Sequence, residues 1–193
     1  MIYSDGNSGW GEEYASKPIR DLMSAHPEDV RWSYIFPLKD GSGNMQQKNG
    51  IDIYYITKFS FQGGSPSLSS PVMFRLAEMY LNKAEAEAKN GMTSAALDDI
   101  DIIRNNRGLQ NSLYNGVLPT GNTVLMVVLN ERRMELAFEG QRWFDLVRID
   151  HGQYGLDFLH SIGKTNATTK NLLLPIPQAE RDANPNLTQN PGY

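Results

Sequence analysis

The segment Asn130–Arg148, NERRMELAFEGQRWFDLVR, constrains the fold more than any other part of the chain. It carries eight charged side chains alongside Trp143 and Phe144, and its single glycine divides what we expect to be two helices. Because charged and apolar residues share the same turns, ion pairs and core contacts must form on the same helices. This pattern favours a structural role, in which one helix is held against another, over catalysis.

Glutamates recur at helical spacing on the first of these two helices. Glu131, Glu135 and Glu139 lie four residues apart, so each faces a like charge, which disfavours an isolated helix. Arginine can offset this repulsion because its guanidinium group binds a carboxylate bidentately. We therefore predict an Arg/Glu network that joins the two helices. Its predicted members are Glu131, Arg132, Arg133, Glu135, Glu139, Arg142, Asp145 and Arg148.

The same charges also allow two functional interpretations. Two of the carboxylates could form a glycosidase pair, and Arg132 with Arg133 could form an anion site. We favour the structural network because catalytic carboxylates need a cleft and two contrasting environments. For the same reason we expect Trp143 and Phe144 to be core residues and stacking partners rather than a ligand platform.

Residues 71–108 have the period of two paired helices. The first helix is expected to end at Asn90–Gly91, since glycine readily adopts the left-handed cap conformation. Thr93 is expected to cap a second helix that continues through Asn106. The pair resembles a tetratricopeptide hairpin, which cannot bury its own faces and needs another part of the chain to cover it. The apolar face of the first helix is predicted from Leu76, Tyr80, Ala84 and Ala88.

Two further helices follow a loop over residues 109–122. Thr123 is expected to cap a third helix that continues to Glu139, and Gly140 separates it from a fourth over residues 142–149. From Asn171 the chain is extended and punctuated by proline. We expect its apolar run LLLPIP to lie along a groove between helices.

The first part of the chain is rich in loops and punctuated by glycine. A short helix is expected over residues 17–25, and alternating or aromatic runs over 30–36 and 51–59 predict an irregular β-hairpin. We divide the chain into a loop-rich region, 1–70, and a helical region with a Pro-rich tail, 71–193. The predicted fold class is mainly α, with tetratricopeptide-like helical hairpins and an irregular region that carries a short β-hairpin.

Composition argues against several classes of function. The 193 residues carry a net charge of −4 without a run of Lys or Arg, so we expect no nucleic-acid partner. The longest aliphatic run, Val124–Leu129, is far shorter than the roughly 20 residues that span a bilayer. Cysteine is absent, the three histidines lack metal-ligand spacing, and no phosphate-binding glycine motif occurs. We expect neither a metal nor a cofactor.

Four segments resemble the SusD/RagB family, and they occur in the family's order. NERRMELAFEGQRWFDLVR resembles its signature NERR-x-EL-x-FEG-x-RWFDL, and LLLPIPQAERDANPNLTQNPGY resembles its C-terminal ending. FRLAEMYLNKAEAEAKNG and IIRNNRGL resemble two of its helical segments. The resemblance covers most of residues 71–193 and is looser over 1–70.

The resemblance implies a protein that binds glycans for nutrient uptake and is not an enzyme. It implies a surface-exposed lipoprotein of the outer membrane, which delivers glycans to a SusC-like TonB-dependent transporter. Members of the family are considerably longer, with a signal sequence, a lipidated cysteine and N-terminal helical repeats. We therefore expect this chain to be a C-terminal portion of such a protein.

Glycan binding needs flat aromatic faces with amides and charged groups near them. Trp10 is the strongest candidate, because a tryptophan between two glycines is hard to bury by local packing, although it could also pin its loop to the helical body. Trp32 lies on the apolar face of a predicted strand, which favours a core position. The candidate ligand residues are Tyr3, Asn7, Trp10, Tyr14 and Trp32.

Two alternatives to glycan capture stay open. The first is a helical, tetratricopeptide-type module that binds a peptide or a protein and no sugar. The second is a glycoside hydrolase domain, which requires two carboxylates about 5–10 Å apart in a cleft.

Overall fold

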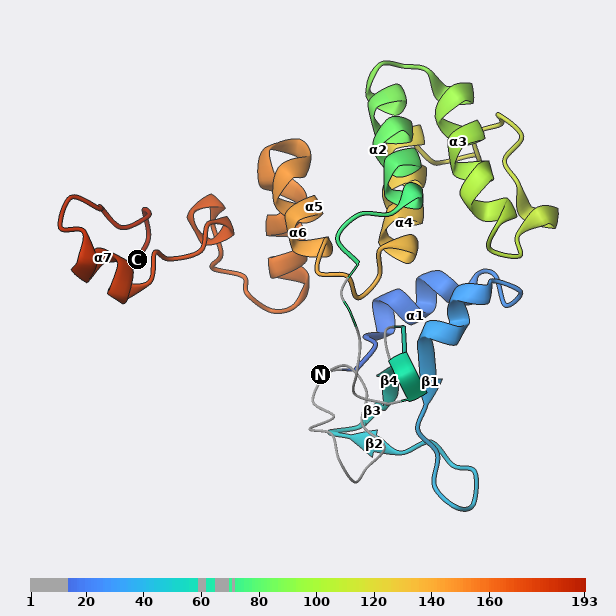
Figure 1. Ribbon diagram of the computed structural model, residues 1–193, viewed down its shortest axis with the longest axis horizontal. Helices are drawn as coiled ribbons and strands as arrows, with labels where there is room; N and C mark the ends of the chain where they lie inside the picture. Colours follow the sequence, from blue (N-terminus) through green and yellow to red (C-terminus); the bar gives the residue numbers. More distant parts are fainter. Residues whose placement is uncertain (1–13, 59–61, 65–69, 71) are drawn as a thin grey trace. The chain divides into compact units, whose positions relative to one another are not determined.

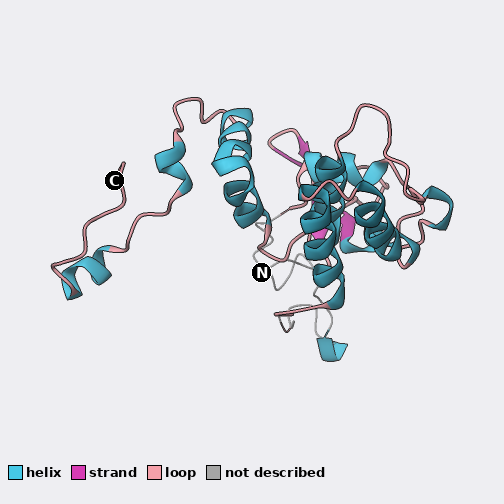
Figure 2. Cartoon of the chain, turned by 90° about the horizontal axis from the view of Figure 1, so that it is seen from above, coloured by secondary structure: helices cyan, strands magenta, loops and turns pink. Residues whose placement is uncertain are grey.

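The computed structural model describes residues 14–58, 62–64, 70 and 72–193 (Figure 1). The chain forms two compact units, Met1–Glu139 and Gly140–Tyr193. Helix far outweighs strand in the described residues, as Figure 2 shows, and the mainly α fold class is confirmed. The α-helices are α1 Lys17–Ser24, α2 Leu76–Lys89, α3 Thr93–Asn105, α4 Val124–Glu135, α5 Arg142–Arg148, α6 Gln153–Ser161 and α7 Gln178–Ala183. The strands are β1 Ile35–Pro37, β2 Gln47–Lys48, β3 Ile51–Asp52 and β4 Tyr54–Ile56. The 3₁₀ turns are η1 Val30–Tyr34, η2 Gln62–Gly64, η3 Gln110–Ser112, η4 Ile149–Gly152 and η5 Thr169–Leu172.

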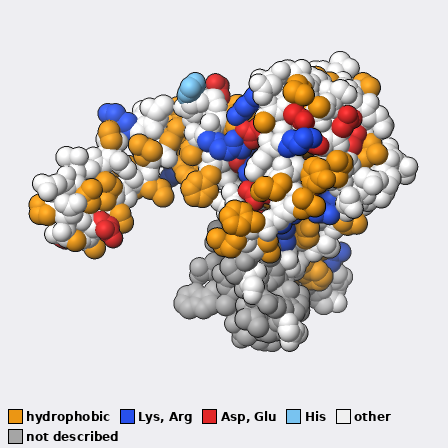
Figure 3. All heavy atoms as spheres, turned by 45° about the horizontal axis from the view of Figure 1, so that its top comes forward, with side chains coloured by type: hydrophobic (Ala, Val, Ile, Leu, Met, Phe, Trp, Pro, Cys, Tyr) orange, Lys and Arg blue, Asp and Glu red, His pale blue; other side chains and the backbone are white. Residues whose placement is uncertain are grey.

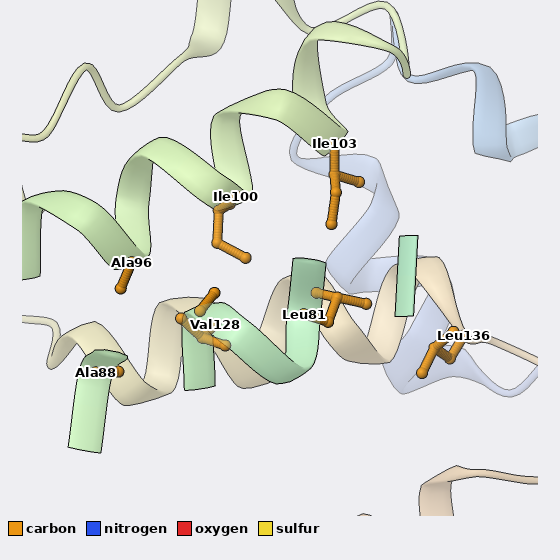
Figure 4. Close-up of a cluster of buried hydrophobic side chains, with 8 residues drawn as sticks. Leu81, Ala88, Ala96, Ile100, Ile103, Val128 and Leu136 are labelled. Carbon is orange, nitrogen blue, oxygen red and sulfur yellow. The ribbon is translucent and has the colours of Figure 1, made fainter. Parts of the chain in front are cut away.

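The main core lies where α2 packs against α3 and α4 (Figure 4). Leu81 and Ala84 of α2 are fully buried there, together with Ile100 of α3 and Val128 of α4. The predicted face of α2 is confirmed except at its first residue, because Tyr80 packs against this core whereas Leu76 is 71% exposed. The two alanines of the predicted face, at 84 and 88, do lie in the core, where their small side chains let α3 and α4 approach.

The helix boundaries follow the expected turn residues with two corrections. Gly91 has a φ of +74° just after α2, as a left-handed helix end requires. Thr123 caps α4 by accepting a hydrogen bond from the amide of Met126, as predicted. Thr93, however, is the first residue of α3, and the N-cap position belongs to Met92, so the capping role assigned to Thr93 was wrong.

Helix α4 ends at Glu135, one turn earlier than predicted. Its terminal carbonyls are taken by side chains: Lys58 Nζ donates to the carbonyls of Glu135 and Ala137, and Arg75 Nη2 donates to that of Glu135. Phe138 then adopts a positive φ of 68°, and a right-handed helix cannot include a residue with this backbone conformation. The charged partners of α4 thus determine where the helix stops.

A second core joins α1, the small sheet and the end of α4. It contains Ile19, Met23, Ile35, Ile56 and Met134. Strand β1 pairs antiparallel with β4, in register Ile35 to Ile56, so the predicted irregular hairpin is confirmed.

The expected strand over residues 30–36 is wrong for its first five residues, which form the 3₁₀ turn η1. The side chain of Asp29 accepts a hydrogen bond from the amide of Arg31 and starts this turn. The turn leaves Trp32 half-buried against the second core rather than on a strand face.

The second unit is built around α5 and α6. Gly155 of α6 lies against Leu172, and a Cβ at this glycine would come within 2.9 Å of Leu172 Cδ2. Leu172 is therefore the buried residue of the LLLPIP run, whereas Leu173 and Leu174 are 53% and 71% exposed. The expectation that this whole run lies in a groove was wrong, because only its first leucine packs closely against the glycines of η4 and α6.

Candidate functional site

Glu135 is the centre of a buried ion-pair network in the first unit. Its carboxylate is fully buried and accepts two hydrogen bonds from Arg107, at 2.9 and 2.7 Å. Arg75 Nη1 donates at 2.5 Å to one carboxylate oxygen, and Arg31 Nη1 lies 3.4 Å from the other. Three guanidinium groups thus converge on one carboxylate.

Glu131 lies one turn before Glu135 on α4 and shares a partner with it. Arg31 Nη1 is 2.7 Å from Glu131 Oε1, and Arg104 Nη1 donates to Glu131 Oε2 at 3.1 Å. Arg31, itself fully buried, also donates to both carboxylate oxygens of Asp29. The repulsion between the two glutamates is therefore offset by shared cations.

Glu139 completes the network at the end of α4. Lys58 Nζ lies 2.6 Å from its carboxylate, and Arg75 donates to both of its oxygens, at 3.1 and 2.7 Å. Arg75 thereby bridges Glu135 and Glu139, the second like-charged pair that the sequence contains. We call the nine residues Asp29, Arg31, Lys58, Arg75, Arg104, Arg107, Glu131, Glu135 and Glu139 the α4 charge network.

The pKa values follow from this arrangement. Burial alone would raise the pKa of Glu135, but hydrogen bonds from Arg107 and Arg75 outweigh it and lower the pKa to about 2. Burial likewise opposes the charge of Arg31, yet its bond to Asp29 and the charge of Glu131 raise its pKa. Burial lowers the pKa of Lys58, and its contact with Glu139 partly counters this effect. Glu135 is therefore ionised throughout the physiological range and unsuited to donate a proton.

The offsetting charges come from other elements than expected. The cations that pair with the three glutamates lie on η1, before α2, on α3 and just after α3. Arg132 donates to Asn82 Oδ1 at 2.8 Å, and burial lowers the pKa of the half-buried Arg133. In the second unit, Asp145 pairs with Arg148 at 2.8 Å, and Arg142 is exposed at the start of α5. Phe144 is 64% exposed, which corrects its expected core position.

One missed member of the network carried a signal in the sequence. Arg104 falls four residues after Ile100, on the buried face of α3, so the helical period alone places a charge in the core. Arg75 lies in a segment without regular period, and Arg31 lies in a run whose strand period the structure does not follow. Their involvement depends on how distant segments meet, since Arg31 and Glu135 are separated by 104 positions.

The candidate aromatic residues divide between described and undescribed segments. Tyr14 bridges to Tyr55, with ring centroids 5.8 Å apart, and Lys48 Nζ lies 5.7 Å from the Tyr14 ring centre. Trp32 is half-buried against the second core. Tyr3, Asn7 and Trp10 lie outside the described residues.

Each unit contains a pocket bordered by described residues. The first, of about 130 Å³, lies between α1, α3 and α4 and reaches the ion pair of Arg104 and Glu131. The second, of about 500 Å³, lies beside the end of α6 and is bordered by Tyr193. Within the described ranges no cluster of three His, Cys, Asp or Glu residues could hold a metal ion. Basic and acidic side chains are interspersed on the face seen in Figure 3.

The chain matches the SusD family over residues 33–193, and it belongs to that family. A curated relative, SusD-like protein P38 of Formosa agariphila, is 28% identical and aligns with 83% of this chain and 35% of its own length. A SusD-like carbohydrate binding protein of Bacteroides vulgatus has a solved structure with 26% identity and a TM-score of 0.52, covering 70% of this chain and 27% of that one.

A further solved structure has a similar fold. A SusD superfamily protein of Bacteroides vulgatus covers 100% of this chain and 47% of its own, with a TM-score of 0.73 at 22% identity. The chain spans about a third of the length of the curated relatives it matches. No helix in the described part of the chain has the length and apolar character that crossing a bilayer requires.

Proposed function

We propose that this chain is part of a protein that captures oligo- or polysaccharides at the outer membrane for nutrient uptake. The observation that carries this proposal is the family match over residues 33–193, together with the likeness to a solved SusD-like carbohydrate binding protein. Delivery to a SusC-like TonB-dependent transporter, from a surface-exposed lipoprotein, is part of the proposal. It rests on the family resemblance alone.

The α4 charge network supports binding over hydrolysis. Glycoside hydrolysis needs one carboxylic acid that holds a proton and one carboxylate free to act as base or nucleophile. Glu131 and Glu135 are at most 1% exposed, and their carboxylate oxygens are paired with arginine side chains. We infer that the network is a scaffold and that the protein has no enzymatic activity of its own.

The loop-rich region 1–70 is our proposed location of the main glycan site, and residues 71–193 its helical support. Tyr3, Asn7 and Trp10 supply aromatic and amide groups in this proposal. Tyr14 and Trp32 each expose part of a ring while packing on neighbours, which suits a fixed wall for a sugar ring. Their packing distinguishes them from freely mobile surface aromatics.

Affinity electrophoresis through gels that contain single polysaccharides tests this function, alongside a turnover assay with the same panel. We expect at least one polysaccharide to retard the chain without being cleaved, and Trp10→Ala to weaken the retardation. Tyr154→Ala is the matched control, because Tyr154 is an aromatic of α6 that is 37% exposed and borders neither recorded pocket. Cleavage of any panel member would contradict the proposal.

One observation favours a protein-interaction module as the second candidate. Met73, Phe74 and Leu76, at and before the start of α2, are 71–81% exposed and form an apolar surface beside a tetratricopeptide-like helix. If no polysaccharide retards the chain, this function takes the place of glycan capture.

A further inference from the structure

We propose that the second unit holds a separate subsite for one sugar ring, formed by Tyr193, Lys164, Thr165 and Asn166. This inference rests on the proposed glycan-binding function and adds a place for the ligand outside the loop-rich region. The pocket of about 500 Å³ beside the end of α6 provides the space. That volume suits a pyranose ring with part of its neighbour.

The wall of the pocket that carries the aromatic ring is held in place by hydrogen bonds. Tyr193 is 54% exposed, and its hydroxyl donates to the carbonyl of Leu173 at 2.9 Å. Asn190 Nδ2 donates to the carbonyl of Leu174 at 2.7 Å, and Gln189 bonds both main-chain groups of Ile176. These hydrogen bonds hold residues 189–193 against residues 173–176, so the Tyr193 ring is positioned before a ligand binds.

The pocket is also bordered by the loop after α6, which internal hydrogen bonds hold in place. His160 Nε2 lies 3.0 Å from the carbonyl oxygen of Ala167, and the amide of Lys164 donates to the carbonyl of Leu159. Asn171 closes the loop by accepting a hydrogen bond from the amide of Thr168. Both walls are therefore preorganised, which lowers the entropy that a ligand loses on binding.

The polar groups inside this frame are available to a ligand. Lys164, Thr165 and Asn166 are exposed, and in the described part of the chain their side chains have no recorded hydrogen bond or ion pair. Together they offer ammonium and amide donors and hydroxyl and amide acceptors, next to a tyrosine ring. Vicinal hydroxyls above an apolar ring face are the complement of such a site.

No aspartate or glutamate side chain borders the pocket, so it lacks the carboxylate pair that glycoside hydrolysis requires. Its contents suit recognition of hydroxyl groups and not bond cleavage. The subsite therefore extends the capture of a glycan chain to a second point, and two weak points on one chain raise the overall affinity.

Nuclear magnetic resonance on the intact 193-residue chain tests the subsite without a polysaccharide. Methyl pyranosides with gluco, galacto, manno and xylo configuration are titrated to millimolar concentration. We expect at least one of them to shift the side-chain amide signals of Asn166 and the ring signals of Tyr193. Sorbitol, which has the hydroxyls without the ring, is expected to leave both sets of signals unchanged.

Variants separate stacking from polar recognition. Tyr193→Ala is expected to weaken pyranoside binding about three- to tenfold, in keeping with one aromatic contact. Tyr193→Phe, which keeps the ring, is expected to lose less. Tyr154→Ala is the control and is expected to bind as the unchanged protein does.

The subsite and the proposed function fail in different ways. Absence of pyranoside shifts at Asn166 and Tyr193, or shifts equal to those from sorbitol, would overturn the subsite even if polysaccharides retard the chain. Polysaccharide retardation that Tyr193→Ala leaves unchanged would also count against it. Pyranoside shifts confined to these residues would support the subsite even where Trp10→Ala has no effect.

Discussion

Replacing Glu135 by glutamine tests whether the α4 charge network stabilises the fold through ionised groups. The substitution keeps the shape of the side chain and removes the charge that Arg31, Arg75 and Arg107 surround. Removing one partner of a buried ion pair typically costs about 3–5 kcal/mol, because the remaining charges lose their compensation. We expect a loss of this size in the free energy of unfolding at pH 7.

The pKa of Glu135 gives an independent magnitude. Its lowering from 4.5 to about 2 corresponds to about 3 kcal/mol, at about 1.4 kcal/mol for each pH unit. Because the folded-state pKa lies below the unfolded one, this stability is present above pH 4.5 and is lost as the pH falls towards 2. At pH 3 about 1 kcal/mol remains, so the gap between the two proteins should narrow by about 2 kcal/mol.

Urea unfolding followed by circular dichroism at pH 7 and pH 3 measures both quantities. Asp21→Asn is the matched control, since the Lys17–Asp21 pair is 74% and 58% exposed and should leave the unfolding midpoint unchanged. A gap that stays the same at the two pH values, or that falls below about 1 kcal/mol at pH 7, would refute the electrostatic argument.

Three further substitutions test packing and backbone geometry by the same unfolding measurement. Leu81→Ala should cost about 2–5 kcal/mol, whereas Leu76→Ala should have little effect, and equal losses would contradict the orientation of α2. Gly108→Ala should destabilise the protein more than Gly121→Ala, although both glycines have positive φ. A Cβ at position 108 would lie 2.9 Å from the carbonyl oxygen of Glu28, whereas a Cβ at position 121 would meet open space. Thr123→Ala should cost about 1 kcal/mol through the lost cap of α4, and an unchanged midpoint would refute that role.

Local sequence signals predicted the helices well and their orientation less well. Gly91 and the Thr123 cap locate helix ends because they act through neighbouring backbone groups. On α2 the predicted face failed only at Leu76, because the position of α3 and α4 decides how far along the helix the core extends. The strand expected over 30–36 failed for its first five residues because a side chain, Asp29, organises the local turn.

In the site, too, local sequence signals predicted some features, while others depend on contacts between residues far apart in the sequence. The periodic glutamates indicated that cations must gather around α4, and that requirement is met. Which cations do so depends on tertiary contacts, since Arg31 reaches α4 from the turn η1 and Arg75 from the segment before α2. The sequence alone pointed to neighbouring arginines, among which Arg132 donates to Asn82 on α2.

The α4 charge network also explains how the charged residues at the end of α4 can be buried inside the first unit. Five cations and four carboxylates meet there. They come from η1 and the residue before it, from the segment before α2, and from α3, α4 and the residues that follow these two helices. Apolar side chains can pack in many ways, whereas a buried carboxylate is stable only where hydrogen-bond donors reach it. The network therefore favours one arrangement of these segments. A rigid helical body of this kind is the support that a binding surface on loops requires, because loops position a ligand only as well as their scaffold holds them.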